Sequence, residues 1–148
     1  MIDFNALRSA YQTARQDLLA ARVPSGHWVG ELSSSALSTA TAVSALAIVA
    51  RETSDESRRE ACHQLVARGI DWLCHRQNED GGFGDTDKSF SNISTTMLVQ
   101  AAMHLAGAAD EHDTLLARAD QYIDEQGGVP GLRNRYGEDR TFAVPILT

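Results

Sequence analysis

Basic residues, cysteines and long apolar runs are all scarce in this chain of 148 residues. Its 13 lysines and arginines are outnumbered by 20 acidic residues, giving a net charge of −7, so the chain lacks the basic stripe of a nucleic-acid-binding protein. It has two cysteines, and its first residues, MIDFNALRSA, hold no apolar signal-peptide core. We therefore expect a cytoplasmic protein with reduced thiols, with a location peripheral to a membrane as the alternative.

Two long segments carry no charge, at residues 32–50 and 89–109. Seven of the 19 residues in the first segment are serine or threonine, which makes it too polar for a membrane-spanning helix. It fits instead a helix that is surrounded by protein. With 43% hydrophobic and 22% charged residues, the composition is that of a single globular domain.

Helical periodicity and capping residues predict an all-α chain. Asp3 is a candidate N-cap of the first helix, in which Phe4, Leu7, Tyr11 and Leu18 share an apolar face. The predicted helices cover about residues 3–22, 35–51, 54–77, 91–107 and 111–126, with a sixth capped by Asp139. The glycine-rich segment 127–131 is expected to end the fifth helix.

The predicted helices alternate between charged and uncharged, which indicates an internal repeat. Gly26-His27-Trp28 aligns with Gly81-Gly82-Phe83 when the sequence is shifted by 55 residues. A third copy begins at 127–129, so the repeats cover about residues 1–51, 52–107 and 108–148. Helix-pair repeats of this length stack into arrays, and uncharged inner helices favour a closed double ring. We therefore predict one domain that forms part of an α/α toroid.

The most specific motif lies at the end of the second charged helix. It consists of Arg68, Gly69, Trp72, Leu73, Gln77, Gly81 and Phe83. This pattern resembles the QW repeat of the squalene–hopene cyclase and oxidosqualene cyclase family, with Phe83 where that repeat has tryptophan. The flanking copies are weaker: the first has Val23 where glutamine is expected, and the third has Gln126 one residue early. The order of the units is similar to the N-terminal quarter of a squalene–hopene cyclase.

The motif itself has a structural interpretation. A glutamine at a helix C-terminus can bond the free backbone N–H groups of the next helix, and the aromatic ring can stack on its amide. We interpret the motif as a staple between repeats. The resemblance implies an α/α toroid, and for the family as a whole it implies polyprenyl or triterpene substrates.

No catalytic residue is identified in the sequence. The family starts its reaction with an aspartic acid in a D-x-D-D motif, and this chain contains no D-x-D-D. The equivalent place in the repeat holds Asn92-Ile93-Ser94-Thr95, which has no carboxylate. The acidic pair Asp85 and Asp87 fits neither a calcium loop nor an aspartate-rich diphosphate site, and a solvated loop is the favoured interpretation.

Metal and cofactor motifs are also missing. Cys62-His63 and Cys74-His75 lie on one predicted helix about 18 Å apart and about 120° different in direction, so they do not meet on one ion. No phosphate-binding glycine loop or nucleophile elbow is present, and we expect no metal and no cofactor.

Some polar and aromatic residues are candidates for lining a ligand site: Trp28, Asp85, Asn92, Gln100 and His104. For His104, a hydrogen-bonded core histidine is the favoured interpretation, and a base lining a pocket is the alternative. For Asn92 and Gln100, capping and core hydrogen bonds come before ligand contact.

Two functions remain open at this point. The first is an N-terminal fragment of a squalene–hopene cyclase-like protein, which forms part of an isoprenoid-binding barrel without supplying its acid. The second is a non-catalytic scaffold on the same repeat that binds a lipid or a peptide. A full toroid would need about 300 residues at this repeat length. We therefore expect the chain to be a fragment of a longer protein or to pair with another copy, because a half ring exposes apolar inner surface.

Overall fold

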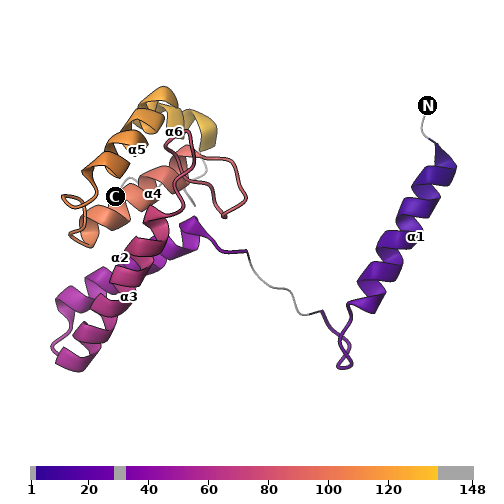
Figure 1. The fold of residues 1–148 in the computed structure, drawn as a ribbon, viewed down its shortest axis with the longest axis horizontal. Helices are drawn as coiled ribbons and strands as arrows, with labels where there is room; N and C mark the ends of the chain where they lie inside the picture. The colour runs from indigo at the N-terminus through magenta and orange to yellow at the C-terminus, as the bar shows by residue number, and fades with distance from the viewer. Residues whose placement is uncertain (1–2, 29–32, 137–148) are drawn as a thin grey trace. The chain divides into compact units, whose positions relative to one another are not determined.

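The structure is a computed structural model that describes residues 3–28 and 33–136 (Figure 1). These residues form helices and turns and contain no strand. The helices are α1 (Phe4–Ala20), α2 (Ala36–Glu52), α3 (Glu56–Cys74), α4 (Ile93–Leu105), α5 (Asp113–Glu125) and α6 (Gly128–Tyr136). The all-α class is as predicted and is consistent with a domain of the α/α-toroid type.

The helix starts follow from local capping. The side chains of Asp3, Ser35, Asp55 and Asn92 accept hydrogen bonds from backbone N–H groups in the first turns of α1, α2, α3 and α4. Each of these bonds satisfies a donor that has no partner within its own helix. The predicted starts of these four helices are therefore confirmed to within a residue or two.

The start of α6 differs from the prediction. As predicted, the fifth helix ends before residues 127–131, at Glu125, but a new helix, α6, begins within them at Gly128 and contains Pro130 in its first turn. Proline is tolerated there because its missing N–H would have no partner in the helix anyway. A Cβ on Gly131 would lie 2.0 Å from the carbonyl oxygen of Gln126, so only glycine allows this tight join between α5 and α6. The helix predicted from Asp139 lies outside the described residues.

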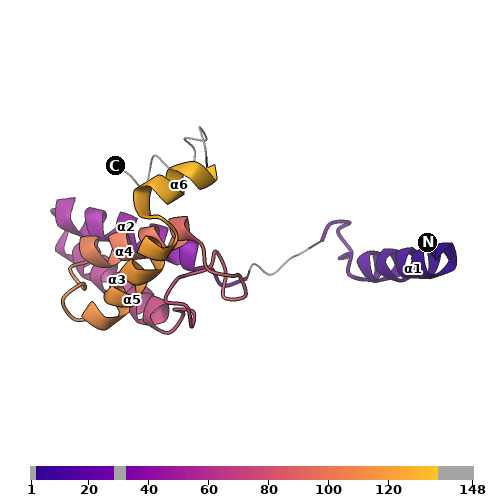
Figure 2. The ribbon, with the colours of Figure 1, turned by 90° about the horizontal axis from the view of Figure 1, so that it is seen from above.

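The chain divides into two compact units, residues 1–32 and 33–148. In the second unit α2 packs against both α3 and α4, and α5 packs against α4 (Figures 1 and 2). The fully buried side chains at the centre include Leu73, Phe83 and Met103. None of the described helices is long and apolar enough to cross a membrane.

The uncharged segment of α2, residues 36–50, is not surrounded by protein in this unit. Its buried residues are Ala36, Ala40, Val43 and Ala50, and they form one stripe. Ile48 and Val49 are each 42% exposed. The absence of charge over residues 36–50 of α2 therefore accompanies an apolar face that is open in the described part of the chain.

Candidate functional site

The turn between α3 and α4 joins three helices. The Gln77 side-chain amide donates to the Gly81 carbonyl at 2.8 Å and to the Leu115 carbonyl of α5 at 2.9 Å. Arg118 of α5 donates back to the carbonyls of Asn78 and Glu79, at 3.1 and 2.9 Å. The turn and the next charged helix therefore hold each other through backbone carbonyl groups.

Gly81 brings the turn into close contact with α5. Its φ is +84°, a conformation that favours glycine, and a Cβ at this position would lie 2.6 Å from the backbone oxygen of Arg118. The sequence predicted a glutamine that accepts from N–H groups at a helix end. The structure instead has the glutamine donating to two carbonyl oxygens.

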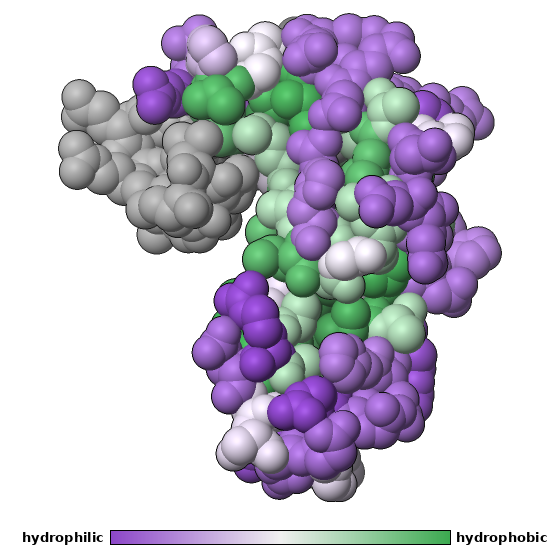
Figure 3. All heavy atoms as spheres, turned by 90° about the vertical axis from the view of Figure 1, so that its left-hand side faces the viewer, coloured by the Kyte–Doolittle hydropathy of each residue, from purple (hydrophilic) through white to green (hydrophobic). Residues whose placement is uncertain are grey.

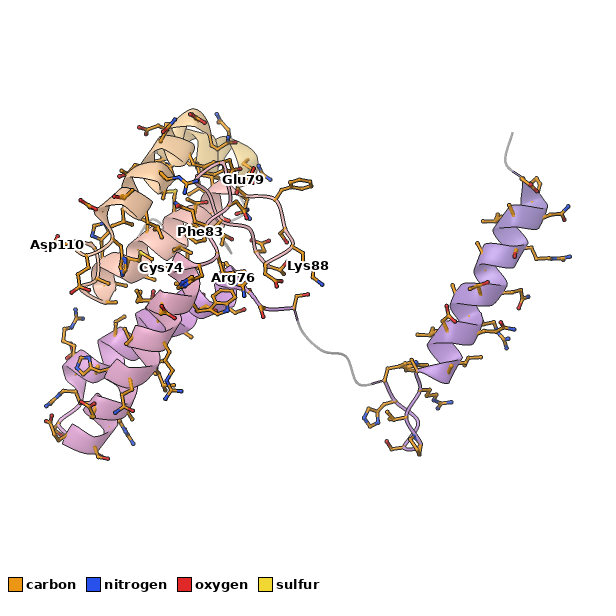
Figure 4. The ribbon with its side chains drawn as sticks, in the orientation of Figure 1. Cys74, Arg76, Glu79, Phe83, Lys88 and Asp110 are labelled. Atoms are coloured by element: carbon orange, nitrogen blue, oxygen red, sulfur yellow. The ribbon has the colours of Figure 1, made fainter. Side chains whose placement is uncertain are left out.

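Phe83 anchors the other side of the turn. Its ring is fully buried and points inward between α3 and α4, whereas Lys88 lies at the outer edge of the following loop (Figure 4). The Phe83 N–H donates to the buried Thr96 hydroxyl at 2.9 Å, and the Phe83 carbonyl accepts from the Asn92 N–H at 3.0 Å. The aromatic residue therefore fixes where α4 begins.

Removal of the Gln77 amide gives a first testable result. Gln77→Met keeps the length of the side chain but loses both hydrogen bonds, and we expect it to lower the free energy of unfolding by about 1–2 kcal/mol. Gln64→Met is the matched control, because Gln64 is exposed on α3 and its side chain bonds only to Glu60 of that helix. Urea unfolding followed by circular dichroism measures both variants. Equal effects of the two substitutions would show that the bond to α5 contributes nothing.

The candidate ligand-lining residues Asp85 and Asn92 are engaged with each other. One Asp85 carboxylate oxygen accepts from the Asn92 amide at 2.8 Å and from the Thr95 hydroxyl. Asn92 in turn accepts from the Thr95 N–H and the Ser94 hydroxyl. Ser35, the cap of α2, donates to the Asp85 carbonyl at 2.7 Å. These groups join the N-terminal ends of α2 and α4.

The other candidates do not gather at one place. Gln100 donates to Asp120 and so links α4 to α5. His104 is exposed, so the interpretation as a core histidine is wrong, since the last turn of α4 is open on that side. Trp28 lies in the first unit, where it is 46% exposed and donates from its indole to the Leu18 carbonyl at 2.6 Å.

A cleft that was not predicted lies between α3 and the corner that joins α4 to α5. It has a volume of about 510 Å³. The cleft is lined by His63, Val66, Ala67, Ile70, Asp71, Cys74, His75, Ala106, Gly107, Ala108, Glu111 and His112.

The cleft brings Cys74 against His112. The Cys74 sulfur lies 3.6 Å from Nδ1 and 3.7 Å from Nε2 of that ring. Because Cys74 ends α3 and His112 directly precedes α5, no local spacing in the sequence indicates this contact. Across the described ranges 3–28 and 33–136, no three His, Cys, Asp or Glu side chains come together in a way that could hold a metal ion.

The Cys74 thiol is expected to react slowly. Burial raises its pKa, and the nearby Asp71 carboxylate raises it further, so a smaller fraction is thiolate at any given pH. At pH 8 we expect iodoacetamide to modify Cys74 more slowly in the folded chain than in urea, and Asp71→Asn to increase the folded-state rate. Mass spectrometry separates Cys74 from the buried Cys62. Equal rates for folded and unfolded chains would contradict the assigned environment.

Comparison with known proteins gives one match. The family model described as the squalene-hopene cyclase N-terminal domain matches residues 11–134. This range covers most of α1, all of α2 to α5 and most of α6. No curated protein and no solved structure matches the chain.

Proposed function

The chain belongs to the squalene-hopene cyclase N-terminal domain family, and from this we propose that it forms part of the wall of an isoprenoid-binding helical barrel. The family match over residues 11–134 is the observation that carries the proposal. In this proposal the repeats at about residues 1–51 and 52–107 each supply an outer, charged helix and an inner helix to the wall, and the repeat at about 108–148 supplies the outer helix α5.

The surface of the inner helices supports this choice of ligand. A hydrocarbon chain is held by apolar contact and shape, with few polar groups needed. Ile48 and Val49 are exposed on α2, and Leu105 is 46% exposed at the end of α4. Leu105 shares a pocket with Ala47 and Ala50 of α2, and the same pocket is also lined by Arg51, Arg59 and His63. On the face shown in Figure 3, apolar residues form a band between hydrophilic borders.

We also propose that this part of the barrel contributes surface and no acid. Protonation of an alkene needs a carboxylic acid kept neutral in an apolar cavity. Asp85 is exposed to solvent, and its carboxylate accepts hydrogen bonds from Asn92 and Thr95. It therefore does not lie in an apolar cavity. The chain contains no D-x-D-D motif in which such an acid could stand.

The turn at residues 77–83 has a supporting role in this proposal. Gln77, Gly81 and Arg118 connect α3 to α5, the outer helices of two successive repeats. We assign the QW-like motif to this structural task, which keeps the inner helices α2 and α4 at a fixed spacing.

A thermal-shift experiment with geranylgeraniol tests the ligand class. We expect this isoprenoid alcohol to raise the melting temperature of the chain, and Ile48→Asp to remove the increase because it places a charge on the apolar face. Val129→Asp is the matched control, since Val129 is 39% exposed on α6. No shift with geranylgeraniol, or an equal shift with hexadecanol, would contradict an isoprenoid-selective surface.

A further inference from the structure

The cleft between α3 and the corner that joins α4 to α5 has no part in the proposed isoprenoid wall. Its volume of about 510 Å³ lies within the range of pockets that hold small molecules in other proteins. Ile48 and Val49, the exposed apolar residues of α2, do not line it. The cleft lies wholly within the second unit and is a separate candidate site.

One part of the cleft is apolar. Val66 and Ile70 lie one turn apart on α3 and are buried, and Ala106 and Ala108 line the cleft from the corner. These side chains offer a ligand apolar contact and no hydrogen bond. The corner leaves space at Gly107, where a Cβ would meet nothing within 4 Å. The cleft can therefore receive a compact hydrocarbon body.

The charged groups that line the cleft, with its histidines counted as neutral, are carboxylates. Asp71 of α3 and Glu111 of the corner both line it, and both are exposed, whereas no lysine or arginine lines it. The Asp71 carboxylate lies 3.7 Å from Nδ1 of His75. Glu111 makes no hydrogen bond or ion pair with the described residues. The cleft therefore combines an apolar surface with negative charge.

Arginines line only the pockets that adjoin the cleft, and they have partners of their own. Arg51 and Arg59 line one adjoining pocket and pair with Glu52 and Glu56. Arg118 lines another, and it donates to two backbone carbonyls of the turn that follows α3. The carboxylates of the cleft are thus available to a positively charged ligand.

We propose that this cleft binds a small organic cation, an ammonium group carried on a compact apolar body. The body packs on Val66, Ile70 and Ala108, and the ammonium group interacts with the carboxylates of Asp71 and Glu111. An ammonium group has only donors and an ionised carboxylate has only acceptors, so the two are complementary. This site is distinct from the isoprenoid surface and does not depend on it.

An NMR titration of the full chain with three adamantane compounds tests the proposal. 1-Adamantylamine, 1-adamantanol and 1-adamantanecarboxylate share one hydrocarbon body and differ in charge. We expect the amine to bind about tenfold more tightly than the alcohol, since two partly solvated carboxylates each contribute modestly, and the carboxylate to bind most weakly. Backbone amide signals of residues 66–75 and 106–112 should shift with the amine.

Substitutions of the two carboxylates locate the charge effect. Asp71→Asn and Glu111→Gln should each weaken binding of the amine by about threefold and leave binding of the alcohol unchanged. Asp124→Asn is the matched control, because Asp124 is exposed on α5 and does not line the cleft. Ile48→Asp, which removes the expected isoprenoid effect, should not change binding of the amine, so the two proposals fail separately.

Three results would overturn the proposal. The first is equal affinity for the amine and the alcohol, or no binding of either. The second is a set of shifted amide signals outside residues 66–75 and 106–112. The third is an effect of Asp124→Asn as large as that of Glu111→Gln, because the preference for the cation would then reflect the overall negative charge of the chain.

Discussion

Gly81→Ala is expected to lower the free energy of unfolding by about 3 kcal/mol, from two causes that add. The first cause is the φ of +84°, which an alanine adopts only with strain. The second is the new Cβ, which would lie 2.6 Å from the Arg118 carbonyl oxygen. That oxygen belongs to the backbone of α5, so the clash is relieved only by moving the turn away from the helix. Urea unfolding followed by circular dichroism measures the loss.

Gly107→Ala separates the two causes. Gly107 has a φ of +70°, but nothing lies within 4 Å of a Cβ placed there. This variant should therefore show the strain alone, about 1 kcal/mol. If Gly81→Ala costs no more than Gly107→Ala, the close contact between the turn and α5 does not exist in solution.

Phe83→Ala is expected to cost about 4 kcal/mol, the largest effect of a side-chain deletion in the turn. The ring is fully buried in the core cluster that also contains Leu73 and Met103, and its removal leaves a cavity that the helices α2 to α5 around this cluster cannot close easily. Phe83→Leu retains most of the volume and should cost about 1 kcal/mol. The free energies of unfolding of both variants in urea provide the check.

A second consequence distinguishes Phe83 from an ordinary core residue. Its backbone is bonded to both Thr96 and Asn92, so loss of the ring should loosen the first turn of α4 before the rest of the helix. Hydrogen exchange should therefore show faster exchange at residues 95 and 96 than at 102 and 103 in Phe83→Ala. Uniform exchange along α4 would contradict an anchoring role.

Helix positions could be predicted from the sequence wherever a local signal decides them. Asp3, Asp55 and Asn92 each stand directly before a helical pattern, and each caps its helix. The start of α6 was missed because glycines such as Gly127 and Gly128 usually end a helix. The close approach of Gly131 to the Gln126 carbonyl depends on the folded course of the backbone, which no local sequence signal indicates.

The contacts at the candidate site depended on packing that the sequence does not specify locally. The Cys74–His112 contact and the bond from Gln77 to Leu115 each join residues that are 38 positions apart. His104 was expected to be buried because α4 carries no acidic residue, lysine or arginine. The last turn of α4 is nevertheless exposed at His104 and Leu105.

Photolabelling with a diazirine-bearing geranylgeranyl analogue tests the central claim most directly, because it shows where an isoprenoid lies on the chain. The proposed wall predicts adducts concentrated in the α2 peptide, Ala36–Glu52, around Ile48 and Val49, with excess geranylgeraniol suppressing them. Adducts confined to the charged helix α5, or labelling that geranylgeraniol does not reduce, would contradict the claim that α2 forms the isoprenoid-facing wall.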